Sequence, residues 1–141
     1  MAIAFQRTIL IADDDRQVRL GVAELLGGMG FRTRLAETGL EALDILRLGG
    51  IHLAVLDQQM PGHTGLEVVT TIRDETLAIP CIVCSGIAGH DLELMALEAG
   101  AIAVLRKPVQ PSRLRTEVLR ALELPPLPGG APFGREGPPR A

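Results

Sequence analysis

Short apolar runs alternate along the chain with longer amphipathic stretches, and the alternation occurs five times. The runs are rich in Ile, Val, Leu and Ala and have the length of buried strands. The predicted strands are Thr8 to Ala12, Phe31 to Leu35, His52 to Leu56, Ile79 to Cys84 and Ala101 to Leu105. The stretches after them carry apolar residues at helical spacing. The predicted helices are Arg16 to Met29, Thr38 to Leu48, Thr64 to Asp74, Asp91 to Ala99 and Pro111 to Leu122.

Five strand–helix units with short connections predict an α/β fold. Strands of a parallel sheet that helices cover on both faces are buried on both sides, which fits their nearly continuous apolar sequences. At this chain length we expect a doubly wound, five-stranded parallel sheet in the order 2-1-3-4-5 with five helices.

The sequence divides near residue 123 into a globular part and a tail. All ten predicted elements lie within residues 1–123, and 47% of the chain is hydrophobic, which is enough to fill one core. Residues 124–141 hold six of the ten prolines and four glycines, a composition that sustains neither helix nor strand. We expect one folded domain followed by a flexible Pro/Gly-rich tail.

Charge and hydropathy narrow the class of partner. The formal net charge is −3, so we expect no basic surface that would hold nucleic acid or an anionic membrane. No apolar run reaches the roughly 18 residues of a membrane span, and the N-terminus lacks the pattern of a signal peptide. We therefore expect a cytoplasmic protein whose partners are other proteins.

The two cysteines form a C-x-x-C pair, Cys81 and Cys84, which raises redox or zinc chemistry as an alternative. The pair falls in a predicted strand, where residues three apart point to opposite faces. Zinc would also need two more ligands. We therefore expect both thiols to serve as small hydrophobic groups in the core.

Acidic side chains gather where the predicted strands end. Asp13, Asp14 and Asp15 follow the first strand, and Asp57 follows the third. Because ligands of open α/β sheets bind at the carboxyl ends of the strands, we expect these carboxylates to lie close together. Their repulsion favours a bound cation, and Mg²⁺ prefers such oxygen ligands while leaving positions for phosphate oxygens. Capping of the next helix accounts for Asp15 equally well, but not for the whole set.

Two further strand ends bring a hydroxyl and a cation to the same edge. Ser85 ends the fourth strand, and Lys107 follows the fifth. Thirteen of the fourteen basic residues are Arg, and Lys107 is the only lysine. Since Lys is a compact point charge and Arg a broad fork, a tight anionic pocket would accept the lysine and exclude Arg.

Taken in order, these strand-end residues resemble the motif set of the CheY-type receiver domain of response regulators, over about residues 7–123. The matching residues are the acidic pair Asp13 and Asp14, the phosphoacceptor Asp57 in the run DQQMPGHTG, the hydroxyl residue Ser85, and Lys107-Pro108. The resemblance implies the flavodoxin-like, CheY-like fold. It also implies an Mg²⁺ site formed by Asp13, Asp14, Asp57 and the backbone carbonyl of Gln59.

The same resemblance implies a phosphorylation switch in a two-component phosphorelay, and not an enzyme with a separate substrate. Asp57 would accept a phosphoryl group from a sensor histidine kinase, a phosphotransfer protein or a small phosphodonor. Lys107 would pair with a phosphoryl oxygen, and Ser85 would move toward another, so that the following loop and helix rearrange. The family often has an aromatic residue three positions before the lysine, where this chain has Val104.

Two positions are expected to tune the lifetime of the phosphoryl group. They are Gln59, two residues after the acceptor, and Ile87, two residues after Ser85. We expect the apolar Ile87 to screen the acyl phosphate from water.

Three alternatives remain open on the sequence. An aspartyl phosphatase of the haloacid dehalogenase type would use the D-x-D of Asp13 and Asp15, although its third carboxylate would not come from the third strand. A flavodoxin-like cofactor carrier would need a glycine- and hydroxyl-rich phosphate loop in place of DDDRQ. A receiver-shaped interaction module would never be phosphorylated. The downstream protein target and a possible homodimer are left undetermined.

Overall fold

The structure is a computed structural model of the chain and describes residues 7–87 and 89–124. Five strands and five helices alternate strictly along it. The strands are β1 (Thr8–Ala12), β2 (Arg32–Ala36), β3 (Leu53–Asp57), β4 (Cys81–Ser85) and β5 (Ala103–Arg106). The helices are α2 (Arg16–Gly28), α3 (Gly39–Leu48), α4 (Gly65–Asp74), α5 (His90–Ala99) and α6 (Pro111–Ala121).

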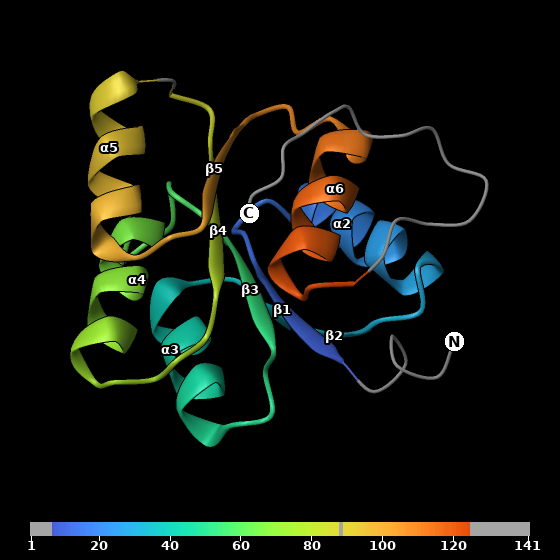
Figure 1. Cartoon of the computed structure of the whole chain (residues 1–141), viewed down its shortest axis with the longest axis horizontal. Helices are drawn as coiled ribbons and strands as arrows, with labels where there is room; N and C mark the ends of the chain where they lie inside the picture. The colour runs from blue at the N-terminus through green and yellow to red at the C-terminus, as the bar shows by residue number, and fades with distance from the viewer. Residues whose placement is uncertain (1–6, 88, 125–141) are drawn as a thin grey trace.

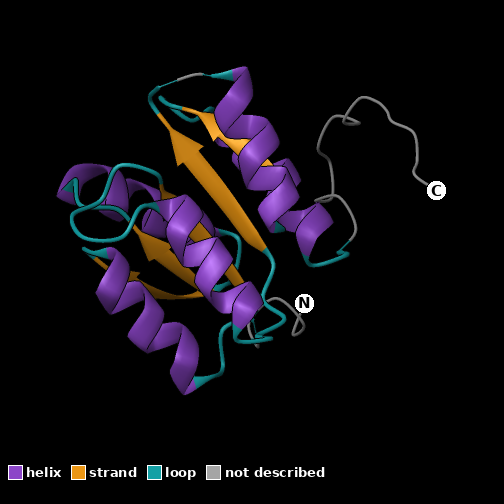
Figure 2. Cartoon of the chain, turned by 90° about the vertical axis from the view of Figure 1, so that its left-hand side faces the viewer, coloured by secondary structure: helices purple, strands orange, loops and turns teal. Residues whose placement is uncertain are grey.

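The strands form one parallel sheet in the order β2-β1-β3-β4-β5, which confirms the predicted topology. Helices α2 and α6 cover one face of the sheet, and α3, α4 and α5 cover the other (Figure 1). Figure 2 shows the second group of helices lying in front of the strands. The strand order reverses beside β1, between β1 and β3, so the carboxyl ends of these two strands flank the crevice where such sheets bind ligands.

Alternate strand residues supply two separate cores, one on each face of the sheet. In β1, Ile9 and Ile11 face α2 and α6, whereas Leu10 and Ala12 face α3, α4 and α5. Cys81 belongs to the second core and Cys84 to the first, so the two thiols diverge as predicted. Burial raises the pKa of each thiol to about 12, far above the range of a reactive cysteine.

Helix α2 starts just after Asp15 and packs loosely on the side that faces α6. Asp15 is its N-cap, and the carboxylate accepts hydrogen bonds from the backbone N–H groups of Gln17 and Val18. The predicted apolar face of α2 is only partly buried, because a cavity of about 630 Å³ separates it from α6. Val22 and Leu114 line this cavity from the two helices.

The loop from β3 to α4 is held tightly against the end of β3. Thr64 and Glu67 form a reciprocal capping box that starts α4. A Cβ atom on Gly65 would lie 2.8 Å from the backbone carbonyl oxygen of Asp57, so only glycine allows this approach. The start of α4 therefore fixes the backbone at Asp57.

Within the described residues, no helix has both the length and the apolarity to cross a membrane. The predicted tail, residues 124–141, lies outside the described part of the chain except for Leu124, which packs against the core under α2 and α6.

Candidate functional site

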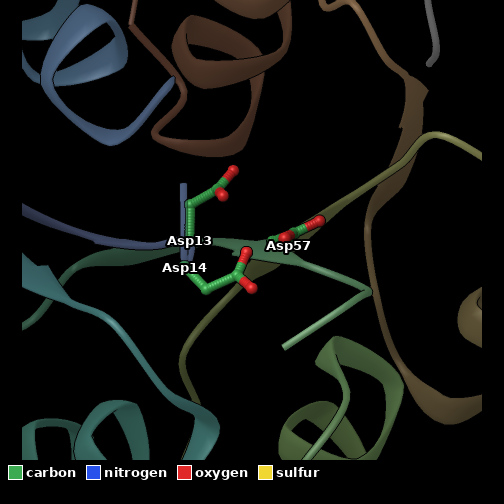
Figure 3. Close-up of side chains that lie close together, drawn as sticks. All are labelled: Asp13, Asp14 and Asp57. Atoms are coloured by element: carbon green, nitrogen blue, oxygen red, sulfur yellow. The ribbon is translucent and has the colours of Figure 1, made fainter. Parts of the chain in front are cut away.

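Three carboxylates converge at the carboxyl ends of β1 and β3, as the sequence predicted. Each of Asp13, Asp14 and Asp57 offers an oxygen atom within 4.8 Å of the others. Figure 3 shows that Asp13 and Asp14 come from the chain just after β1 and Asp57 from the end of β3. Asp13 and Asp57 are buried, and Asp14 is exposed, so the cluster opens to solvent on the Asp14 side.

The chain's single lysine reaches into this cluster. The Nζ atom of Lys107 lies 2.8 Å from Asp13 Oδ2 and 3.1 Å from Asp57 Oδ1. The side chains of the two carboxylates are 6% and 3% exposed, and that of Lys107 is 22% exposed. One ammonium therefore compensates two buried negative charges, and Asp14 adds a third carboxylate beside them.

The environment of Asp57 works against its ionised form. Burial raises the pKa of the carboxyl and the nearby Asp13 charge adds to this, while the hydrogen bond from Lys107 opposes them without reversing the shift. For Lys107, burial lowers the pKa, but hydrogen bonds to Asp13 and Asp57 outweigh that and leave the pKa above its ordinary value. The ammonium stays charged, and a second cation near Asp57 would stabilise the ionised form of its buried carboxylate.

The remaining contacts fix Asp13 and Asp57 and leave Asp14 free. The Asp13 carboxylate accepts from the backbone N–H of Asp15 at 2.9 Å, and Asp57 accepts from the backbone N–H of Gln59 at 3.3 Å. Among the described residues, nothing donates a hydrogen bond to the Asp14 carboxylate. Hard oxygen donors, net negative charge and one exposed member suit a divalent cation such as Mg²⁺.

Ser85 ends β4 on the neighbouring strand, buried at the same edge of the sheet. Its hydroxyl donates to the backbone carbonyl of Ile87 at 3.0 Å and accepts from the backbone N–H of Ile87 at 3.1 Å. The Ile87 side chain itself is 66% exposed. Val104 packs partly buried on β5 and lines a cavity of about 310 Å³ together with Ser85 and Ile87.

Sequence reasoning missed two residues that hold the site. Arg19 is buried in α2 and donates a hydrogen bond from Nη1 to the backbone carbonyl of Asp13 at 2.7 Å. Gly65 allows the close approach to Asp57 described above. The sequence pattern predicts an exposed Arg at such a position of an amphipathic helix. The one signal for a buried role is that Arg19 lies four residues after the helix N-cap, close to the end of β1.

Comparison with known proteins agrees with this geometry. The sequence model of the response regulator receiver domain matches residues 9–119. The chain is 38% identical over 105 residues to a protein-glutamate methylesterase/protein-glutamine glutaminase 1 of Anaeromyxobacter dehalogenans, covering 71% of this chain and 29% of that protein. It is 34% identical over 115 residues to the response regulator protein PilR of Pseudomonas aeruginosa, covering 82% of this chain and 26% of that protein.

Solved structures show the same likeness. A CheY-like response regulator receiver domain protein from Methanospirillum hungatei superposes with a TM-score of 0.78 at 27% identity, covering 83% of this chain and 94% of that chain. The chain thus spans less than a third of the two curated relatives but nearly all of the solved receiver domain. With the predicted sheet order and a family match across both cores, this chain belongs to the response regulator receiver domain family of two-component systems.

Proposed function

We propose that this domain is a phosphorylation switch in which the Asp57 carboxylate accepts a phosphoryl group. The observation that carries the proposal is the contact of the buried Asp57 with Lys107, beside an acidic pair that the topology brings to the same edge. Such a site stabilises charge on a transferring phosphoryl group mainly by positioning and electrostatics.

In the transfer step, an Asp57 carboxylate oxygen would form the new O–P bond while the bond to the donor breaks. With a phosphohistidine donor, the N–P bond breaks and its electron pair stays on the imidazole nitrogen. Lys107 would exchange a carboxylate contact for a phosphoryl oxygen, since its flexible stem lets the ammonium follow the new charge. Asp13 would keep Lys107 near the acceptor.

The metal in this proposal is Mg²⁺, held by Asp13, Asp14, Asp57 and the backbone carbonyl of Gln59. When bound, Mg²⁺ would neutralise the charge of the carboxylates and of the phosphoryl oxygens. The exposed Asp14, which has no donor among the described residues, fits the role of a ligand that a cation completes.

The switch in this proposal is Ser85. Its hydroxyl donates to the backbone carbonyl of Ile87 and accepts from the Ile87 N–H, so a phosphoryl oxygen must compete with the Ile87 carbonyl for the hydroxyl proton. Movement of Ser85 would shift the loop that leads into α5. Because Val104 replaces the usual aromatic residue, the signal would pass through this loop and α5.

The proposed phosphodonor is a sensor histidine kinase or a phosphotransfer protein of a two-component phosphorelay, which fits the family and the small net charge. We propose a cytoplasmic location, one receiver domain over residues 1–123 with a tail after it, and no catalytic activity on a separate substrate. The esterase and glutaminase names belong to a relative of which this chain covers 29%.

The test is to treat the protein with acetyl phosphate and Mg²⁺ and to map the modified residue by mass spectrometry. We expect a phosphoryl group on Asp57, dependence on Mg²⁺, and no label in an Asp57→Asn variant. Label on Asp13 would favour a phosphatase of the haloacid dehalogenase type, in which Asp15 is also needed. The capping role of Asp15 argues against that mechanism. Absence of label and of Mg²⁺ binding would favour an unphosphorylated interaction module.

A further inference from the structure

Arg19 is an unusual residue for the inner side of a helix. It is only 7% exposed, and burying a guanidinium is costly unless its charge and donors are satisfied. Its ion-pair partner, Glu37, lies 3.6 Å away with a side chain that is 69% exposed, so this pair is weak. The short contact is the 2.7 Å hydrogen bond to the Asp13 carbonyl.

That carbonyl belongs to the peptide that joins the two residues of the acidic pair. Asp13 is fixed through its other groups as well, since its N–H donates to Ala36 and its carboxylate oxygens accept from Asp15 and Lys107. Asp14 has no comparable restraint on its side chain among the described residues. The direction in which the Asp14 carboxylate points thus depends on the plane of the preceding peptide, and Arg19 holds the oxygen of that peptide.

We propose that Arg19 is a positioning residue that sets Asp14 for cation binding by fixing the Asp13–Asp14 peptide. This inference rests on the proposed function, because it concerns the same site. Arg19 does not contact the cation or the phosphoryl group in this role. It acts through the backbone, as groups behind metal ligands commonly do.

The measurement is Mg²⁺ affinity by isothermal titration calorimetry of the unphosphorylated protein. The chain has no Trp or Tyr, so intrinsic fluorescence is unsuitable. We expect Arg19→Met, which keeps the apolar stem but removes the donor and the charge, to weaken Mg²⁺ binding by about tenfold. Arg19→Lys keeps a cationic donor and should recover most of that loss.

Two other roles for Arg19 predict different results. If Arg19 acted only through its positive charge, Arg19→Met would tighten Mg²⁺ binding, because a cation near a cation site is removed. If it served only the stability of the fold, the variant would unfold at lower urea concentration with unchanged Mg²⁺ affinity. Either result would overturn the proposal.

A double-mutant cycle tests the route through Asp14. In an Asp14→Asn background, Arg19→Met should change Mg²⁺ affinity less than about twofold, because the group that it positions no longer acts as a charged ligand. An unchanged tenfold effect there would contradict the proposed route. Arg47→Met is the matched control, since Arg47 pairs with Glu75 at the far end of α3, and it should leave Mg²⁺ affinity unchanged.

The outcomes separate this inference from the proposed function. If the wild-type protein is labelled on Asp57 but Arg19→Met binds Mg²⁺ normally, the role of Arg19 is wrong and the phosphoacceptor site stands. If the wild-type protein binds Mg²⁺ and loses affinity in Arg19→Met but is never labelled, the phosphoacceptor function fails and the role of Arg19 stands.

Discussion

Removing the charge of Lys107 should lower the free energy of unfolding. Protonation of Asp13 or Asp57 limits the size of that loss. In Lys107→Met, Asp13 and Asp57 remain buried without their shared cation. Breaking a buried ion pair by removing one partner typically costs about 3–5 kcal/mol. The loss can be smaller, because one of the two carboxylates can take up a proton and so lose its negative charge.

The free-energy cost of this protonation follows from the ordinary pKa of an Asp side chain, 3.8. Keeping such a group protonated costs about 1.4 kcal/mol for each pH unit above this value, or roughly 4 kcal/mol at pH 7 and about 1.6 kcal/mol at pH 5. The loss of unfolding free energy in Lys107→Met should therefore be about 3–4 kcal/mol at pH 7 and less than about 2 kcal/mol at pH 5. In Lys107→Met the remaining buried carboxyl has a higher pKa in the folded than in the unfolded state, so the free energy of unfolding falls as the pH rises.

Urea unfolding followed by far-ultraviolet circular dichroism measures this difference at both pH values, with and without saturating Mg²⁺. A bound cation should recover part of the loss at pH 7, because it replaces the missing positive charge. Arg47→Met is the control, since its solvent-screened pair with Glu75 should give a smaller loss that Mg²⁺ does not change. A loss in Lys107→Met that is equal at both pH values and indifferent to Mg²⁺ would refute this reasoning.

Four further outcomes test other parts of the domain. Asp57→Asn should raise the unfolding free energy at neutral pH without Mg²⁺, because burial already disfavours the charged form of Asp57. Gly65→Ala should lower the free energy of unfolding by about 1–3 kcal/mol and slow the labelling of Asp57. The control is Gly21→Ala, whose Cβ has open space around it and which should stabilise α2 by about 0.5–1 kcal/mol in the same urea assay. Cys81 and Cys84 should resist thiol reagents until the protein unfolds, and stability should fall as the pH rises above 9.0, where unfolded thiols ionise first. Ile87→Glu or Ile87→Lys should change the half-life of phosphorylated Asp57 severalfold, and an unchanged half-life would exclude a screening role for Ile87.

Most of the fold follows from local patterns in the sequence. Apolar runs and helical spacing placed all ten elements within about two residues of their observed ends. Phe31 shows where such patterns lose precision, because its side chain is buried while ladder pairing in β2 begins only at Arg32. The pattern also indicated which face of α2 is apolar, but not the distance to α6, which depends on how both helices settle on the sheet.

The clustering of the candidate site residues was predictable, because the sheet topology brings the carboxyl ends of the strands to one edge. Once the parallel strands are placed in order, Asp13 and Asp57 follow from adjacent strands β1 and β3. Lys107 follows β5, on the far side of β4, and its long side chain reaches both carboxylates from the same edge of the sheet. The supports behind them were not predictable. Arg19 reaches back from α2 to the carbonyl of Asp13, and Gly65 lets the start of α4 lie against the backbone of Asp57. Neither contact leaves a periodic signal in the sequence.

In the proposed function, the switch would combine a restrained hydroxyl, that of Ser85, with a helix of shallow burial, α5. The two hydrogen bonds of Ser85 hold the loop to the backbone of Ile87. In the proposed function, a phosphoryl oxygen must replace the Ile87 carbonyl as the acceptor of the Ser85 hydroxyl before the loop can move. Beyond the loop, α5 buries only Ala96 and Ala99, and beside Val104 lies a cavity of about 310 Å³. A helix with such shallow anchoring can shift toward open space without expelling an aromatic ring. Under the proposed function, the absence of the usual aromatic residue would therefore move the energetic control of signalling from β5 to the Ser85 hydroxyl and the packing of α5.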